Sequence, residues 1–282
     1  MALRINYNQA SSQAQRGVSG AQNSFFSAIS QLSSGLRINK AADDSAGLAV
    51  SEKLKNQVRG LNQAQRNAQD AISLLQTAEG ALTETHSLLA RMRELAVQAS
   101  NDTLQASDRA NAQLEFTALY AEIDRIASAT QFDGTVLLDN SSVVTGMSIQ
   151  IGANSGDALT FTISSAKATS LNAAFVAMNT ATTLSVGFQS TASAVISALD
   201  TAINTVSTYR SNIGAMQNRL SSATNYIGVA SENTAAANSR IADADIATSM
   251  SELVRAQILQ QAGISVLAQA NQAPSLVLQL LK

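Results

Sequence analysis

The feature that most constrains the fold is a heptad-like spacing of apolar residues, which recurs in two separate parts of the chain. One series contains Leu54, Val58, Leu61, Ala68, Ile72, Leu75, Leu82 and Leu89, and the other contains Ile196, Leu199, Ile203, Val206, Ile213, Leu220, Ile227 and Ala230. The first predicts a helix from about 44 to 99, and the second a helix from about 192 to 241. A helix as long as the first extends roughly 80 Å at 1.5 Å per residue. It must therefore lie against another long helix, and the second series supplies it.

Composition points to extended helices rather than to a thick globular core. The 282 residues include a single proline, 4% are aromatic and 13% are charged. Few prolines leave helices uninterrupted, and few aromatic side chains leave small residues to fill helix seams. This balance favours a structural protein over an enzyme.

Both ends of the chain are predicted to form amphipathic helices that the central pair leaves without a partner. The N-terminal stripe contains Ala14, Val18, Ala21, Phe25, Ile29 and Leu32, and the C-terminal stripe contains Met250, Leu253, Val254, Ile258, Val266 and Leu267. We expect the C-terminal helix to end before Pro274. The remaining partners for these stripes are each other and other copies of the chain, so the stripes are the candidate polymerisation sites.

The middle of the chain changes its period twice. A helix is predicted from about Ser107 to Ala129, with Leu114, Leu119, Ile123 and Ile126 as its apolar positions. Alternating apolar residues on either side of the turn-rich run 152–157 then predict a β-hairpin within about 133–165. Residues 164–190 show no firm period and are expected to form a short variable connector.

The predicted fold is mainly α: a long antiparallel helical hairpin of coiled-coil type with terminal amphipathic helices and one small β-hairpin region. We expect an inner terminal-helix domain of residues 1–42 with 241–282 and a central domain of residues 43–240. Asp43 and Asp44 lie at the predicted start of the first long helix, where carboxylates can cap it.

Composition also disfavours several classes of partner and site. A net charge of −2 provides no basic field for nucleic acid. No run approaches the roughly 20 apolar residues of a membrane-spanning helix, and residues 1–20 carry no signal-peptide pattern. The chain has no cysteine, and its single histidine, His86, has no second ligand at helical spacing. We therefore expect no catalytic, cofactor-binding or metal site.

Longer motifs stand at both ends. They are Ile5–Asn8, Gln31–Asn39 and Ala41–Ala49 near the start, and Arg240–Asp245, Arg255–Gly263 and Val266–Gln272 near the end. With these motifs the chain resembles bacterial flagellin, the subunit of the flagellar filament, over about residues 1–165 and 190–282. The resemblance departs in the middle, where larger flagellins carry outer domains and this chain has a short connector.

The resemblance implies an extracellular subunit of the bacterial flagellum that is exported without a cleaved signal peptide and polymerises into an open helical filament for motility. It implies flagellar cap and junction proteins as partners, and an export chaperone on the C-terminal helix. Arg91, Leu95 and Glu115 match positions that a vertebrate Toll-like receptor contacts in this family.

Other interpretations are compatible with parts of the same pattern. A flagellin-like hook–filament junction protein would share the terminal helices but form a short ring. A protease-bearing flagellin is disfavoured because the zinc motif His-Glu-x-x-His is absent. A generic coiled-coil adaptor would explain the heptads but not the terminal motifs.

Overall fold

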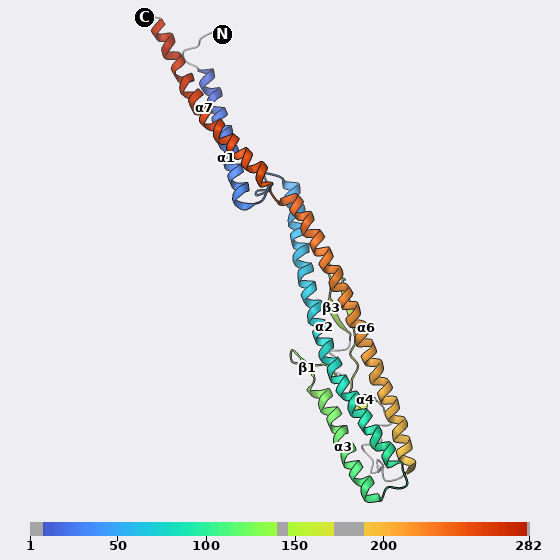
Figure 1. The fold of residues 1–282 in the computed structure, drawn as a ribbon. Helices are drawn as coiled ribbons and strands as arrows, with labels where there is room; N and C mark the ends of the chain where they lie inside the picture. Colours follow the sequence, from blue (N-terminus) through green and yellow to red (C-terminus); the bar gives the residue numbers. More distant parts are fainter. Residues whose placement is uncertain (1–7, 140–145, 172–188, 281–282) are drawn as a thin grey trace. The chain divides into compact units, whose positions relative to one another are not determined.

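The computed structural model describes residues 8–139, 146–171 and 189–280 (Figure 1). The chain divides into two compact units, one of Met1–Val58 with Glu232–Lys282 and one of Arg59–Ser231. The main helices are α1 (Gln9–Ser34), α2 (Ser45–Ala99), α3 (Ala106–Ala129), α6 (Gln189–Ala242) and α7 (Ile246–Leu280). Two small antiparallel hairpins and the short helix α4 (Ala168–Leu171) complete the described chain. The predicted class, mainly α with a small β region, is confirmed.

The core of the second unit is the predicted heptad seam. Leu75, Leu82 and Leu89 of α2 are at most 1% exposed, and Leu199 and Leu220 of α6 are fully buried in the same cluster. In this unit α3 runs beside α2 (Figure 1), and Phe116 and Ile123 belong to the cluster. Heptad spacing therefore identified the buried faces of both long helices.

The buried face of α3 differs from the predicted one. Ile123 is buried as expected, but Leu114 is 72% exposed, so its assignment to the inner face is wrong. The inner positions are Ala112, Phe116, Tyr120, Ile123 and Ala127, spaced four, four, three and four residues apart. Leu114 lies two residues from both Ala112 and Phe116, which on a helix turns it away from the seam.

The predicted β-hairpin is present, and a second hairpin precedes it. Strands β3 (Met147–Gln150) and β4 (Ala158–Phe161) pair Met147 with Phe161, and both Leu159 and Phe161 are buried in the core of the second unit. Strands β1 (Gln131–Phe132) and β2 (Thr135–Val136) are joined by Asp133 and Gly134, which both have positive φ. An Asp-Gly pair is the sequence signal for such a turn.

Helix caps in the first unit follow local chemistry. Gly35 ends α1 in the left-handed conformation at φ 71°, which glycine adopts without strain. Asp44 accepts the Gly47 N–H through Oδ1 at 2.8 Å, so it caps α2 as predicted. Asp245 caps α7 by accepting the N–H groups of Ala247 and Thr248.

The C-terminal helix continues past the single proline. We expected it to end before Pro274, but α7 extends to Leu280, so that prediction is wrong. A proline inside a helix removes one backbone hydrogen bond and disfavours the helix by roughly 3 kcal/mol. A hydrogen bond from α1 offsets part of that loss, since the Asn8 side chain donates to the Ala270 carbonyl at 2.7 Å and such a bond contributes about 1 kcal/mol.

The connector predicted at 164–190 begins with buried structure. Ala166, Ala168 and Leu171 lie in the core of the second unit, and the Ala168 N–H donates to Asp124 of α3 at 2.9 Å. The rest of the predicted connector lies mostly outside the described residues.

Candidate assembly surface

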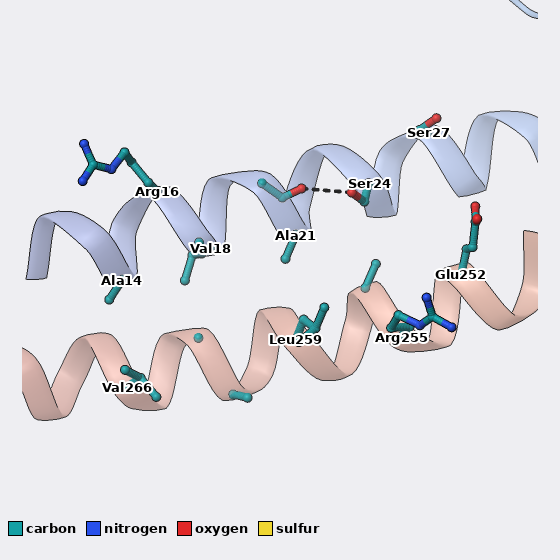
Figure 2. A pocket seen from close by; sticks show the side chains of 15 residues that line it. Ala14, Arg16, Val18, Ala21, Ser24, Ser27, Glu252, Arg255, Leu259 and Val266 are labelled. Atoms are coloured by element: carbon teal, nitrogen blue, oxygen red, sulfur yellow. Dashed lines mark hydrogen bonds between the residues drawn. The ribbon is translucent and has the colours of Figure 1, made fainter. Parts of the chain in front are cut away.

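Helices α1 and α7 pack against each other in antiparallel fashion within the first unit (Figures 1 and 2). The residues of α1 on this seam are half-buried or buried at heptad spacing: Ser11, Ala14, Val18, Ala21, Phe25, Ala28 and Leu32. Those of α7 repeat the spacing: Ser249, Leu253, Ala256, Gln260, Gly263, Leu267 and Ala270. A three–four alternation over this length is the pattern of a paired coiled coil.

Small side chains bring the two helices close together. Ala28 and Ala256 are 2% and 3% exposed, and Ser249 is 5% exposed. At Gly263 a Cβ atom would lie 2.7 Å from Val18 Cγ2, so a side chain there would collide with α1. Figure 2 shows Val18 and Ala21 pointing from α1 toward α7. A residue larger than glycine at 263 would therefore require the helices to move apart or Val18 to rotate.

The predicted polymerisation residues separate into two groups. The first group lies on the α1–α7 seam and contains Ala14, Val18, Ala21, Phe25 and Leu32 of α1 and Leu253 and Leu267 of α7. The others are exposed in the single chain: Ile29 by 39%, Met250 and Val254 by 47%, Val266 by 59% and Ile258 by 60%. Sequence periodicity merged these groups into one stripe, although they face different directions.

Further apolar side chains enlarge the exposed group. Phe26, Ile246, Leu259 and Ile264 are each more than half exposed. The seam and the exposed residues together make α7 apolar on several sides. A helix that is apolar all round is characteristic of a buried environment, and α1 covers only one side of α7. We call Met250, Val254, Ile258, Leu259, Ile264 and Val266 the exposed α7 surface.

An open groove of about 800 Å³ runs between α1 and α7 (Figure 2). Its α1 wall consists mostly of small residues, among them Gly17, Gly20 and Ser24, and its α7 wall includes Leu259 and Val266. The described residues of α1 and α7 carry three charged side chains, Arg16, Glu252 and Arg255, and all three line this groove. The groove is thus mainly apolar, with both signs of charge at its edges.

A short paired segment links α1 to α2 and α6 to α7 inside the first unit. Leu36 and Asp243 form an antiparallel bridge, with backbone hydrogen bonds from Arg37 to Ala242 at 2.7 Å and from Ala244 to Gly35 at 2.9 Å. The Arg37 guanidinium also donates to the Ile241 carbonyl at 2.7 Å. The α1–α2 connection and the α6–α7 connection are therefore hydrogen-bonded directly to each other.

Two carboxylates near these connections favour their charged form. Asp43 accepts the backbone N–H groups of Lys40 and Asn39, which lowers its pKa. The pKa of Asp245 is lowered by hydrogen bonds from the Thr248 hydroxyl and then from the N–H groups at the start of α7. Hydrogen bonds donated to a carboxylate stabilise its ionised form.

The predicted receptor-contact residues do not share one surface. Arg91 of α2 is exposed and forms an ion pair with Glu115 of α3 at 2.8 Å and another with Glu94 at 3.0 Å. These hydrogen bonds raise the pKa of Arg91, with Glu115 as the larger cause. Leu95 is only 2% exposed and packs in the core, so its side chain does not lie on the surface that presents Arg91. It falls on the same buried stripe as Met92 and Ala99.

Comparisons with known proteins agree with this architecture at both ends of the chain. The model of the bacterial flagellin N-terminal helical region matches residues 5–143, and that of the C-terminal helical region matches residues 196–281. A flagellin from Halalkalibacterium halodurans is 47% identical over 99% of each chain, and one from Bacillus subtilis is 42% identical over 99% of this chain and all of its own. This chain belongs to the bacterial flagellin family.

A solved structure of the family shares part of the helical arrangement. A crystal structure of Bacillus cereus flagellin matches 57% of this chain and 88% of its own, with 36% identity and a TM-score of 0.50. The family resemblance predicted from the terminal motifs is therefore confirmed, as is the short form of the chain, because relatives match it over nearly their whole length.

The α1–α7 seam contains residues that apolar periodicity overlooked. Ser11, Ala28, Ser249 and Ala256 lie on the seam, but small or polar side chains add little to a hydrophobic pattern. Their three–four spacing was the available signal. Among the described residues, no group of histidine and acidic side chains is arranged to hold a metal ion. The helices described here also include none that is long and apolar enough to cross a membrane.

Proposed function

We propose that this flagellin is the structural subunit of a flagellar filament and assembles through its terminal helices. The observation that carries the proposal is the exposed α7 surface, since Met250, Val254, Ile258 and Val266 are 47–60% exposed in the single chain. A second copy is the partner that can cover it in every subunit. Contacts between different surfaces of identical copies generate an open helix when the rotation does not close a ring.

The energy that burial of these side chains would contribute is of the same order as the entropic cost of association. Burying the remaining half of a Val, Ile, Leu or Met side chain contributes about 1 kcal/mol. Six such side chains on the exposed α7 surface would contribute on the order of 6 kcal/mol per subunit before the entropic cost of association is subtracted. The mostly apolar α1–α7 groove, with about 800 Å³ of space, is the surface best suited to receive the four of these side chains that do not line it, since Leu259 and Val266 already belong to its α7 wall.

The same exposed surface supports a coupling between assembly and helix formation. A separate α1–α7 pair leaves much apolar area in water, so we expect the terminal helices to open readily in the dilute subunit and to close in the filament. Amide exchange tests this: slow exchange at Val18 and Leu253 in dilute monomer would contradict it.

The family assignment extends the proposal to location and partners. The filament would be extracellular, and the subunit would be exported without a cleaved signal peptide and bind flagellar cap and junction proteins. An export chaperone would bind α7, whose exposed apolar surface would otherwise be in water.

Recognition by a Toll-like receptor would use the exposed Arg91–Glu115 pair. Leu95 would act indirectly, by holding α2 in place from the core, because its side chain is 2% exposed. Charge reversal at Arg91 should then reduce receptor activation far more than a conservative Leu95→Met change. Equal losses from both changes would oppose this division of roles.

Electron microscopy of the purified chain, after seeding or salting out, tests assembly directly. The full chain should form long tubes, and a version limited to residues 42–240 should not. Short rings or persistent monomers would favour the junction-protein alternative, and tubes from the truncated chain would place assembly on other helices.

A pair of point variants sharpens this test. Val254→Gln with Ile258→Gln keeps the α1–α7 seam but removes apolar area from the exposed α7 surface, so tubes should be lost. The volume-conserving control Val254→Ile with Ile258→Val should still assemble. Equal assembly by both variants would show that this surface is not an interface.

A further inference from the structure

The side chain of Asn8 contacts both terminal helices at once. Its Oδ1 atom accepts the Ser11 N–H at 3.1 Å and thereby caps α1. Its Nδ2 atom donates to the carbonyl of Ala270 on α7 at 2.7 Å. An amide can do both because its acceptor and its donor are separate atoms, whereas an ionised aspartate has no donor and a serine carries both functions on one shorter hydroxyl. The Ser11 hydroxyl adds a hydrogen bond to Asn271 at 2.7 Å.

The Ala270 carbonyl, to which Asn8 donates, has no hydrogen-bond donor within its own helix. In an α-helix the carbonyl of Ala270 would accept the N–H of residue 274, four positions later. Residue 274 is the single proline of the chain and has no N–H. Pro274 therefore leaves this carbonyl without its helical donor, and α7 nevertheless continues to Leu280. Asn8 supplies the missing donor from the opposite helix.

We propose that Asn8 and Pro274 together set the register in which α1 and α7 pair. In the native register the Asn8 amide meets a carbonyl that has lost its helical donor. A shift by one heptad toward Gly263 would place the amide opposite a carbonyl that already accepts the Leu267 N–H, and would leave the Ala270 carbonyl unsatisfied. Asn8 is thus a positioning residue, and α7 beyond Ala270 depends on α1 for its stability.

A reporter disulfide can measure the pairing in the soluble full chain. The Val18 Cβ atom lies 3.8 Å from the ideal Cβ position at Gly263, which is the usual separation in a disulfide. The chain contains no cysteine, so Val18→Cys with Gly263→Cys creates a single reporter pair. The equilibrium constant for forming this disulfide is measured in a glutathione buffer. Urea is added until α1 and α7 are mostly separated in the reduced chain. The constant then reports how often the two helices pair in the native register.

The decisive comparison places Asn8→Ser in two backgrounds of this reporter. Serine still caps α1 but lacks the amide donor. Asn8→Ser should lower the equilibrium constant about fivefold when Pro274 is present, as expected for one lost hydrogen bond. With Pro274→Ala the residue at 274 regains an N–H, and Asn8→Ser should then change the constant by less than about twofold.

The outcomes separate the proposal from its alternatives. If Asn8→Ser prevents cross-linking altogether, adding Pro274→Ala must restore it. An unchanged constant with Pro274 present, or the same loss in both backgrounds, would overturn the proposal. Because the reporter works in dilute monomer, this result does not depend on whether the chain forms filaments.

Discussion

Gly263 offers a quantitative test of the α1–α7 seam. In Gly263→Ala the new Cβ atom would lie 2.7 Å from Val18 Cγ2, about 1 Å closer than a favourable carbon–carbon contact. Valine in a helix strongly prefers one rotamer, so it cannot turn aside without cost. Overpacking of this kind costs about 1–3 kcal/mol, while replacing a helical glycine by alanine gains about 1 kcal/mol. The net expectation is a destabilisation of the pair by about 1 kcal/mol.

Amide exchange between Ala14 and Ala21 measures this effect in the full chain. Millisecond labelling is appropriate because we expect the pair to open readily in the monomer. A destabilisation of about 1 kcal/mol should make exchange about fivefold faster in Gly263→Ala. The control is Gly20→Ala, where a Cβ atom would meet nothing within 4 Å. It should slow exchange, since it gains helix propensity without a collision.

A second background makes the test decisive. Val18→Ala removes Cγ2, so the collision at position 263 disappears and Gly263→Ala should become stabilising by about 1 kcal/mol. If Gly263→Ala is stabilising with Val18 present, or remains destabilising after Val18→Ala, then steric contact with Val18 is not what selects glycine at this position.

Two other predictions concern acid sensitivity and the core. The pKa of Asp245 is lowered in the folded chain, so its stabilisation of α7 is complete above its unfolded pKa and should be lost as the pH falls below about 4. Asp245→Asn should flatten this acid-induced loss of helix, followed by circular dichroism of filaments, and an unchanged acid profile would oppose the assignment. On α3, Phe116→Ala should lower the free energy of unfolding by about 3–5 kcal/mol, whereas Leu114→Ala should change it by less than about 0.5 kcal/mol. Urea unfolding of the second unit's helices distinguishes them, and similar losses from both variants would refute the burial pattern described above.

Much of the fold could be predicted from local patterns. Heptad spacing located α2 and α6 and their buried residues, because a long helix must bury one continuous stripe. The alternation of apolar and polar residues located β3 and β4, and the capping residue Asp44 identified the start of α2. These features depend on residues close in sequence, so the sequence carries them directly.

The candidate site was only partly predictable. The terminal stripes were identified, but their division between the α1–α7 seam and the exposed α7 surface was not, since α7 is apolar on several sides. Leu114 was placed on the wrong face for a related reason: a leucine on a helix can pack inward or remain exposed, and only neighbouring helices decide which.

What the sequence determined by itself is the helical class, the lengths of the long helices, the hairpin and the family. What only the tertiary structure decided is how surfaces from distant parts of the chain meet. Pro274 alone predicts a helix end, yet α7 continues past it, and Asn8, far away in the sequence, donates to the Ala270 carbonyl that Pro274 leaves without its helical donor. Periodicity describes one helix at a time, whereas satisfaction of a buried polar group or closure of a seam requires the partner helix to be in place.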